Sequence, residues 1–199
     1  MFFTDSLVTR TFIILCYCFK QDQRLLQWCR ENQNHYSSTT SVTALLHIPS
    51  QRLFVAHIGD SKIILGRVVE LQDQKTGEQV SHLVGEELTT DHKPDMRAEL
   101  DRIEASGGSL TYLHGGKPFI RGGDFSRRKH AMQLNYSRAF GGKDLKMYGL
   151  SAEPDVNEIQ LCKGKERVVI LGSDGNCPWA WEIKKNTDNF AALDLIVHT

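Results

Sequence analysis

The sequence predicts an α+β domain in which antiparallel strands dominate. Two segments have the spacing of amphipathic helices, whereas most other apolar runs are short and rich in β-branched residues. The connections between the first strand-like runs are only a few residues long, and a parallel crossover needs a dozen or more. The chain has 199 residues, of which 40% are hydrophobic and 24% charged, a composition typical of a soluble globular domain.

The first predicted element is a helix over residues 5–31. Apolar residues recur there at three- and four-residue steps, and neither Gly nor Pro interrupts them. The polar cluster 32–40 ends this helix. Three strand-like runs follow, separated by short turns, and we expect them to pair as an antiparallel meander: Ser41–His47, Arg52–Ile58 and Lys62–Val69.

The second half of the chain predicts one more helix and three more strands. An apolar stripe runs along residues 95–106, and Gly107 suits the position after the last helical turn. Residues 72–82 are polar and predict a surface hairpin or loop, while the glycine-rich residues 114–130 predict a long loop. The remaining strand-like runs are 156–161, 167–171 and 190–197.

Charge and cysteine content exclude several classes of function. Lys plus Arg and Asp plus Glu both number 24, so the formal net charge is zero, which argues against nucleic-acid and membrane binding. No apolar run approaches the roughly 20 residues of a membrane span. The five cysteines include no C-x-x-C pair, so neither a disulfide framework nor a zinc site is expected. The cysteine content fits a reducing compartment, so we expect an intracellular protein in the cytoplasm or nucleus. We also expect a monomer.

Three aspartates stand at the ends of strand-like runs. Asp60 and Asp174 each follow a buried run and a glycine, and Asp188 precedes the final run. Clustered aspartates favour hard cations such as Mg²⁺ or Mn²⁺. Aspartate in a glycine-containing turn is also a common turn former, so the spacing alone leaves both interpretations open.

Six blocks in order along residues 41–197 resemble the metal-dependent protein serine/threonine phosphatases of type 2C. The order of the blocks makes the resemblance specific, since no single block would be. The blocks are Ser41–Ala44 with Leu53–Lys62, Leu88–Pro94 with Glu99, Arg102–Ile103 and Gly107–Gly108, Tyr136–Gly141, Ser151–Val156, Ile170–Gly175, and Asp188–Asn189.

The resemblance implies a β-sandwich flanked by helices, with two Mg²⁺ or Mn²⁺ ions in the cleft between the sheets. In that mechanism a metal-activated water, not a side chain, attacks the phosphorus of phosphoserine or phosphothreonine in a phosphoprotein substrate. Asp174 and Asp188 match the family's metal-binding aspartates, and Asp60 matches an aspartate of an additional, weaker metal position. Arg138 and Asp91–Pro94 match motifs with structural or cleft-shaping roles.

The chain departs from the family pattern in several places. It contains neither the opening acidic pair near a phosphate-binding arginine nor the metal-bridging Asp-Gly-His-Gly-Gly loop, and Gly142 stands where the family usually has aspartate. Asp174 and Asp188 are 14 positions apart, where the family places two helices. We therefore expect a truncated or alternatively spliced domain, with residues 1–40 as an N-terminal helical segment of the same domain and 41–199 as a partial phosphatase domain.

Two alternative functions remain at this point. A catalytically dead homologue that serves as a binding or regulatory module would explain the absent bridging motif. An esterase would use Gly59-Asp60-Ser61 as its nucleophile motif, but Asp194 and His198 are one residue too far apart for the usual Asp-x-x-His pair.

Overall fold

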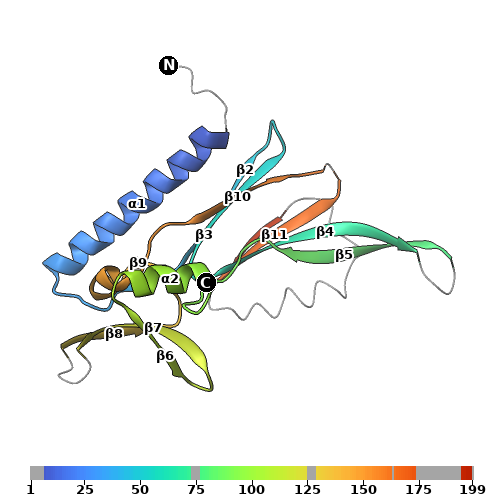
Figure 1. Ribbon diagram of the computed structural model, residues 1–199. Helices are drawn as coiled ribbons and strands as arrows, with labels where there is room; N and C mark the ends of the chain where they lie inside the picture. The colour runs from blue at the N-terminus through green and yellow to red at the C-terminus, as the bar shows by residue number, and fades with distance from the viewer. Residues whose placement is uncertain (1–6, 73–76, 125–128, 163, 174–193, 199) are drawn as a thin grey trace, which may run out of the picture. The chain divides into compact units, whose positions relative to one another are not determined.

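The computed structural model describes residues 7–72, 77–124, 129–162, 164–173 and 194–198 (Figure 1). Helices and mainly antiparallel sheets make up this part of the chain, which confirms the α+β prediction. The helices are α1 (Leu7–Glu31), α2 (Arg97–Ala105) and the 3₁₀ helix η1 (Lys143–Tyr148). The strands are β1 (Ser38–Thr39), β2 (Ser41–His47), β3 (Arg52–Ile58), β4 (Lys62–Gln72), β5 (Gln79–Glu87), β6 (Ser109–Leu113), β7 (Lys117–Asp124), β8 (Lys129–Leu134), β9 (Phe140–Gly141), β10 (Asp155–Gln160), β11 (Glu166–Gly172) and β12 (Asp194–His198).

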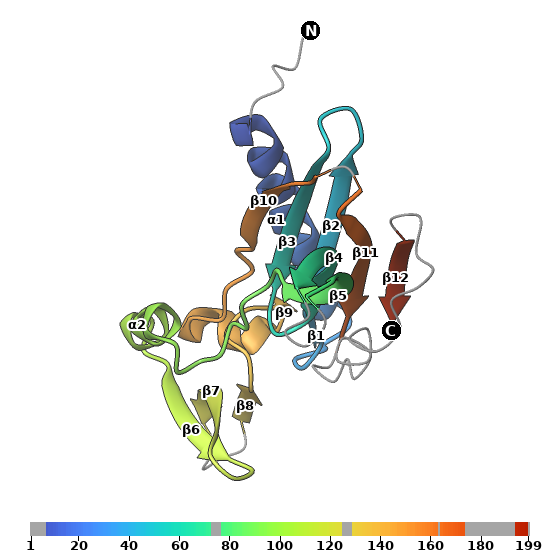
Figure 2. The same cartoon turned by 90° about the vertical axis from the view of Figure 1, so that its right-hand side faces the viewer.

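The chain forms two compact units. The first unit comprises residues 1–41, 58–60 and 91–156, and it contains both α-helices, η1 and the sheet β6-β7-β8. The second unit comprises residues 42–57, 61–90 and 157–199, and it contains most of the sheet β10-β3-β2 and all of the sheet β12-β11-β4-β5. The strands of the second unit are seen in Figure 2.

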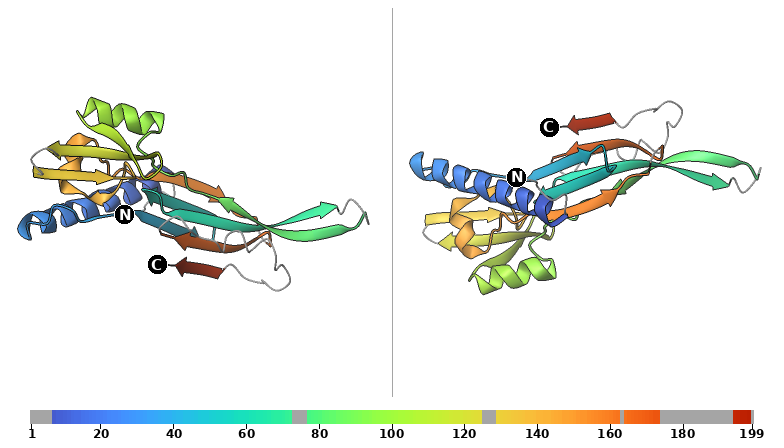
Figure 3. Two further views of the ribbon diagram at one scale, coloured as in Figure 1. Left: turned by 90° about the horizontal axis from the view of Figure 1, so that it is seen from below. Right: turned by 90° about the horizontal axis from the view of Figure 1, so that it is seen from above.

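The second unit is a sandwich whose two sheets share one apolar core. Alternate residues of β3, β4 and β11 supply it, as the period of two along a strand requires. The buried side chains are Leu53, Val55, Ile63, Leu65, Leu161, Val169 and Leu171. Antiparallel pairing joins β4 to both β11 and β5, and the long β4–β5 hairpin is clear in Figure 3. β12 pairs with β11 in parallel.

The predicted meander over residues 41–69 is wrong in one respect. β2 and β3 share a sheet, but β4 belongs to the other sheet of the sandwich. The short turn over residues 59–61 therefore carries the chain from one sheet to the other. Turn length excludes a parallel crossover, yet it does not distinguish a hairpin from such a corner. The two strands still face the same core, because Val55 and Ile63 both contribute to it.

The first unit packs α2 and η1 with the three-stranded sheet. Its core side chains are Ile103, Ile120, Met132, Ala139, Leu145 and Leu150. α1 belongs to this unit too, and the Asp22 carboxylate of α1 accepts hydrogen bonds from the Gly141 amide at 2.8 Å and the Lys146 ammonium at 2.9 Å. Among the helices in the described ranges, none has both the length and the apolarity to cross a bilayer.

The loop predicted over residues 114–130 is also wrong, because the segment contains β7 and the start of β8. Its glycines suggested a loop, but Gly122 lies within the strand and is needed for packing. A Cβ atom there would come within 2.2 Å of the Tyr148 ring, so the glycine permits a close approach that a side chain would block. The burial of Ile120 and Met132 then fixes which face of the hairpin points to the core.

Candidate functional site

Asp60 lies in the turn that follows β3, and Gly59 gives this turn its shape. Gly59 has a φ of +92°, in the left-handed region that favours glycine. A Cβ atom at this position would come within 2.3 Å of the Thr40 side chain and 3.1 Å of the Arg138 carbonyl oxygen. No residue with a side chain fits here without a shift of its neighbours, so glycine is what places the Asp60 carboxylate.

Asp60 forms an ion pair with Lys93. The Lys93 ammonium donates to Asp60 Oδ2 at 2.5 Å and lies 3.7 Å from Asp91 Oδ2. The three side chains are 21%, 32% and 30% exposed, for Asp60, Lys93 and Asp91 respectively. The Lys93 ammonium thus lies within ion-pair distance of both carboxylates, and all three side chains are partly exposed to solvent.

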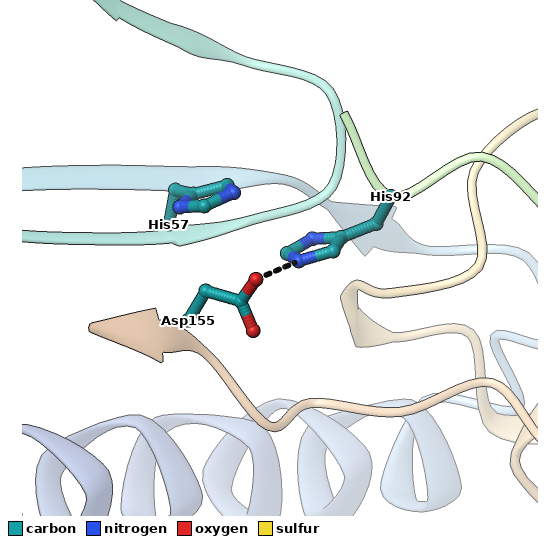
Figure 4. Close-up of side chains that lie close together, drawn as sticks. All are labelled: His57, His92 and Asp155. Carbon is teal, nitrogen blue, oxygen red and sulfur yellow. Dashed lines mark ion pairs between the residues drawn. The ribbon is translucent and has the colours of Figure 1, made fainter. Parts of the chain in front are cut away.

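His92 holds the turn that carries Asp60. The His92 amide donates to the Gly59 carbonyl at 3.0 Å, and the Gly59 amide donates to His92 Nδ1 at 3.0 Å. Because Nδ1 accepts a hydrogen bond, the proton of the neutral ring is assigned to Nε2. That nitrogen lies 3.3 Å from Asp155 Oδ2 (Figure 4). His57, also labelled in Figure 4, belongs to the second unit, where its Nε2 lies 2.8 Å from the Thr90 carbonyl oxygen.

A charge network centred on the buried Glu99 carboxylate lies beside this turn in the first unit. It consists of Glu99, Arg102, Ser137, Arg138 and Asp155, and we call it the Glu99 network. The Glu99 carboxylate is only 3% exposed and accepts from Arg102 Nη2 at 2.6 Å, Arg138 Nη2 at 2.7 Å and the Ser137 hydroxyl. Arg138 also donates to Asp155 Oδ1 at 2.8 Å. Helix α2 is thereby joined to the segment around Arg138 and to the start of β10.

The network keeps its groups charged. Burial alone would raise the pKa of Glu99, but hydrogen bonds from Arg102, Arg138 and Ser137 outweigh it and hold that pKa well below its ordinary value. Burial likewise opposes ionisation of Asp155, yet the charge of Arg138 lowers its pKa overall. Burial disfavours the charged form of Arg138, but Glu99 and Asp155 raise the pKa of Arg138 overall. Such groups do not exchange protons near neutral pH, so the network is suited to positioning rather than to acid–base catalysis.

The structure describes one of the three predicted metal-binding residues. Asp60 is placed as above, whereas Asp174 and Asp188 lie outside the described residues. Sequence reasoning named Glu99 and Asp155 only as parts of motifs and gave them no role. Glu99 lies four residues before the buried Ile103, so an acidic residue on the apolar face of a helix was the available signal.

Asp60 and Asp91 supply two of the oxygen donors that a hard divalent cation would need. Carboxylate oxygens are the ligands that Mg²⁺ and Mn²⁺ prefer, and the Lys93 ammonium already stands as a cation between the Asp60 and Asp91 carboxylates. The esterase alternative fits less well, because Ser61 is only 3% exposed and a nucleophile must be reachable.

Comparisons with known proteins identify relatives over most of the chain. The family model described as "Protein phosphatase 2C" matches residues 15–177. A protein of Oryza sativa subsp. japonica named "Probable protein phosphatase 2C 44" is 32% identical over 158 residues, which cover 79% of this chain and 39% of that protein. "Probable protein phosphatase 2C 61" of Arabidopsis thaliana is 28% identical, covering 91% of this chain and 51% of the relative.

Solved structures resemble the chain as well. The serine-threonine phosphatase 2C from Toxoplasma gondii is 44% identical, with a TM-score of 0.69 over 82% of this chain and 49% of that one. A C. elegans sex determining protein shares the fold, with a TM-score of 0.58 and 20% identity over 81% of this chain and 32% of that one. The chain spans about half or less of the length of these relatives. The chain belongs to the protein phosphatase 2C family.

Proposed function

We propose that this chain is part of a metal-dependent protein serine/threonine phosphatase that acts on phosphoserine and phosphothreonine in phosphoproteins. The observation that carries the proposal is the family match over residues 15–177, which includes the turn that presents Asp60. Mg²⁺ or Mn²⁺, when bound, activates a water for in-line attack on phosphorus. Asp174 and Asp188 are the proposed principal metal ligands, and Asp60 is the proposed ligand of a weaker position.

The described residues have a positioning role in this proposal. Gly59 gives the turn its left-handed conformation, and the paired backbone and ring hydrogen bonds to His92 keep it in place. The Glu99 network supports the same region, because Arg138 reaches Asp155 and Asp155 faces His92. Carboxylates held this firmly are suited to binding a cation at a defined position.

The chain's own turnover is expected to be low, even in millimolar Mn²⁺. Its 199 residues contain no Asp-Gly-His-Gly-Gly, the loop expected to bridge both metals, and the family's phosphate-binding arginine has no match. Two-metal hydrolysis uses both ions to stabilise the attacking and leaving oxygens, so a single ion loses much of that stabilisation. A missing arginine also removes a bidentate partner of the phosphate dianion.

Hydrolysis of a phosphothreonine peptide by the purified chain tests the proposal, with Asp174→Asn as the variant. We expect slow Mn²⁺-dependent turnover that disappears in Asp174→Asn. Robust turnover that the substitution removes would show that this chain supplies a bridging ligand of its own.

The second candidate is a catalytically dead homologue that binds a phosphoprotein or a regulatory partner. The missing bridging loop favours it, together with the Lys93 ammonium that already neutralises Asp60. Phosphopeptide binding without any Mn²⁺-dependent turnover would favour this candidate over the enzyme. Fluorescence anisotropy of a labelled phosphothreonine peptide, with the unphosphorylated peptide as control, measures that binding.

A further inference from the structure

The backbone of Lys93 is hydrogen-bonded on both sides, whereas its side chain is long and flexible. The Lys93 amide donates to the Asp91 carbonyl at 3.0 Å, and the Lys93 carbonyl accepts from Met96 at 3.1 Å. Pro94, which follows, is fully buried. The four-carbon stem of a lysine has several rotatable bonds, so the ammonium can leave Asp60 without any change in the backbone.

Asp60 has a shorter side chain with fewer rotatable bonds. It follows Gly59, whose amide and carbonyl groups both bond to His92. When the Asp60–Lys93 pair separates, the longer Lys93 side chain can carry its ammonium farther than the short Asp60 side chain can carry its carboxylate. Lys93 is therefore the more mobile partner.

We propose that Lys93 is an internal counter-ion of Asp60 and competes with a divalent cation for this carboxylate. The inference deepens the proposed function, on which it rests, because it names what controls loading of the Asp60 position. A cation can take Asp60 Oδ2 only after the Lys93 ammonium leaves it, so the ion pair lowers the affinity of this position for the cation.

The Lys93 ammonium and a divalent cation are expected to bind the Asp60 carboxylate with comparable free energies. The pair is partly exposed, so water screens it and its separation costs little. A divalent cation has twice the charge of the ammonium, but it must lose part of its hydration shell to bind a carboxylate directly. Removing Lys93 abolishes the competitor and also removes a like charge beside the incoming ion, and both changes strengthen cation binding.

Mn²⁺ titration of the full chain tests the inference, with free Mn²⁺ measured by electron paramagnetic resonance. We expect Lys93→Met to tighten the weakest Mn²⁺ site by roughly three- to tenfold. Lys117→Met is the matched control, because it removes the same charge from an exposed side chain on β7, and its titration should follow the parent chain. Lys93→Gln provides a second variant, and far-UV circular dichroism checks that each variant is folded.

A double variant shows where the added affinity arises. Asp60→Asn combined with Lys93→Met should not show the tighter Mn²⁺ binding of Lys93→Met, because the carboxylate for which Lys93 and the cation compete is absent. Unchanged affinity in both folded Lys93 variants, or a gain that persists without Asp60, would overturn the inference. If Asp174→Asn still removes Mn²⁺ binding in that case, the proposed metal-dependent function stands. Loss of Mn²⁺ binding in every chain, the parent included, would overturn the proposed function together with the inference.

Discussion

The second unit is held together by apolar side chains from alternating strand positions, whereas the first unit combines a small apolar core with a cluster of charges around the buried Glu99. In the second unit, Leu65 of β4 and Val55 of β3 belong to one core supplied by both sheets. In the first unit, Glu99 lies as deeply as Ile103 on the same helix, yet it contacts two arginines instead of apolar atoms. The two units therefore illustrate two ways of stabilising a structure. An apolar core tolerates small rearrangements, whereas a charge network is strongly destabilised when any one partner is removed.

That contrast agrees with the positions of the candidate functional residues. Asp60 and His92 belong to the first unit, and His92 reaches the Glu99 network through Asp155. Directional hydrogen bonds fix orientation better than apolar contacts do, since they depend on angle as well as on distance. A unit that must present a carboxylate at a defined position gains from such a network.

Removal of Glu99 should have the largest effect on stability. Glu99→Ala leaves Arg102 and Arg138 without their buried carboxylate, and loss of one partner of a buried ion pair costs about 3–5 kcal/mol. Urea unfolding measures the change in the free energy of unfolding. Glu104→Ala is the control, because Glu104 is an exposed acidic residue of the same helix. Equal effects of the two substitutions would contradict a special role for the network.

Truncation of a side chain in the apolar core of the second unit should have the next largest effect on the free energy of unfolding. Leu65 is fully buried, and Leu→Ala substitutions at such positions cost about 2–5 kcal/mol through lost transfer energy and the cavity left behind. Hydrogen exchange measured by mass spectrometry distinguishes the two units. We expect faster exchange in β4 and β11 for Leu65→Ala, and in α2 for Glu99→Ala. The same exchange pattern in both variants would mean that the units unfold as one.

The pH dependence of stability should distinguish the charge network of the first unit from the apolar core of the second. The pKa of Glu99 in the folded chain lies below its ordinary value of 4.5, so unfolding in acid takes up a proton at this residue. Its contribution to stability is complete above pH 4.5 and is lost as the pH falls below that value, at about 1.4 kcal/mol per pH unit. Glu99→Gln should flatten this dependence, whereas Leu65→Ala should lower the whole curve and leave its slope unchanged. Urea unfolding between pH 3 and 6 tests both expectations.

The same contrast explains which parts of the fold could be predicted from the sequence. The strands Ser41–His47 and Arg52–Ile58 were predicted with their observed bounds, because β-branched residues and a short turn are local signals. β7 and β8 were missed, because the burial of Ile120 depends on α2 and η1, which are distant in sequence. A local pattern cannot report a tertiary contact that overrides a glycine-rich composition.

The candidate site was predictable in part for a similar reason. Asp60 stood out because it follows a buried strand and a glycine, and the resemblance to the phosphatase family gave it a role. Its pairing with Lys93 joins residues 33 positions apart, and the link from Arg138 to Glu99 joins residues 39 positions apart. No local spacing encodes either pair. The motifs that contain these residues were recognised, but only the structure shows that they meet.

The exposed ion pair Arg97–Asp101 should show the smallest effect, although it lies on the same helix as Glu99. The two side chains are 3.1 Å apart at the i, i+4 spacing, but Arg97 is 88% exposed and Asp101 52%. Water screens such a pair, and holding two long side chains in one geometry costs conformational entropy, so its contribution is only about 0.3–0.5 kcal/mol. Arg97→Met should therefore change the free energy of unfolding, measured by urea titration, by no more than about 0.5 kcal/mol, and 1 M salt, which screens exposed charges, should reduce even that difference. Arg97 and Arg138 carry the same charge and pair with the same kind of group, but the Arg138 side chain is only 15% exposed. An effect of Arg97→Met as large as that of Arg138→Met would mean that burial does not set the strength of the ion pairs in the first unit.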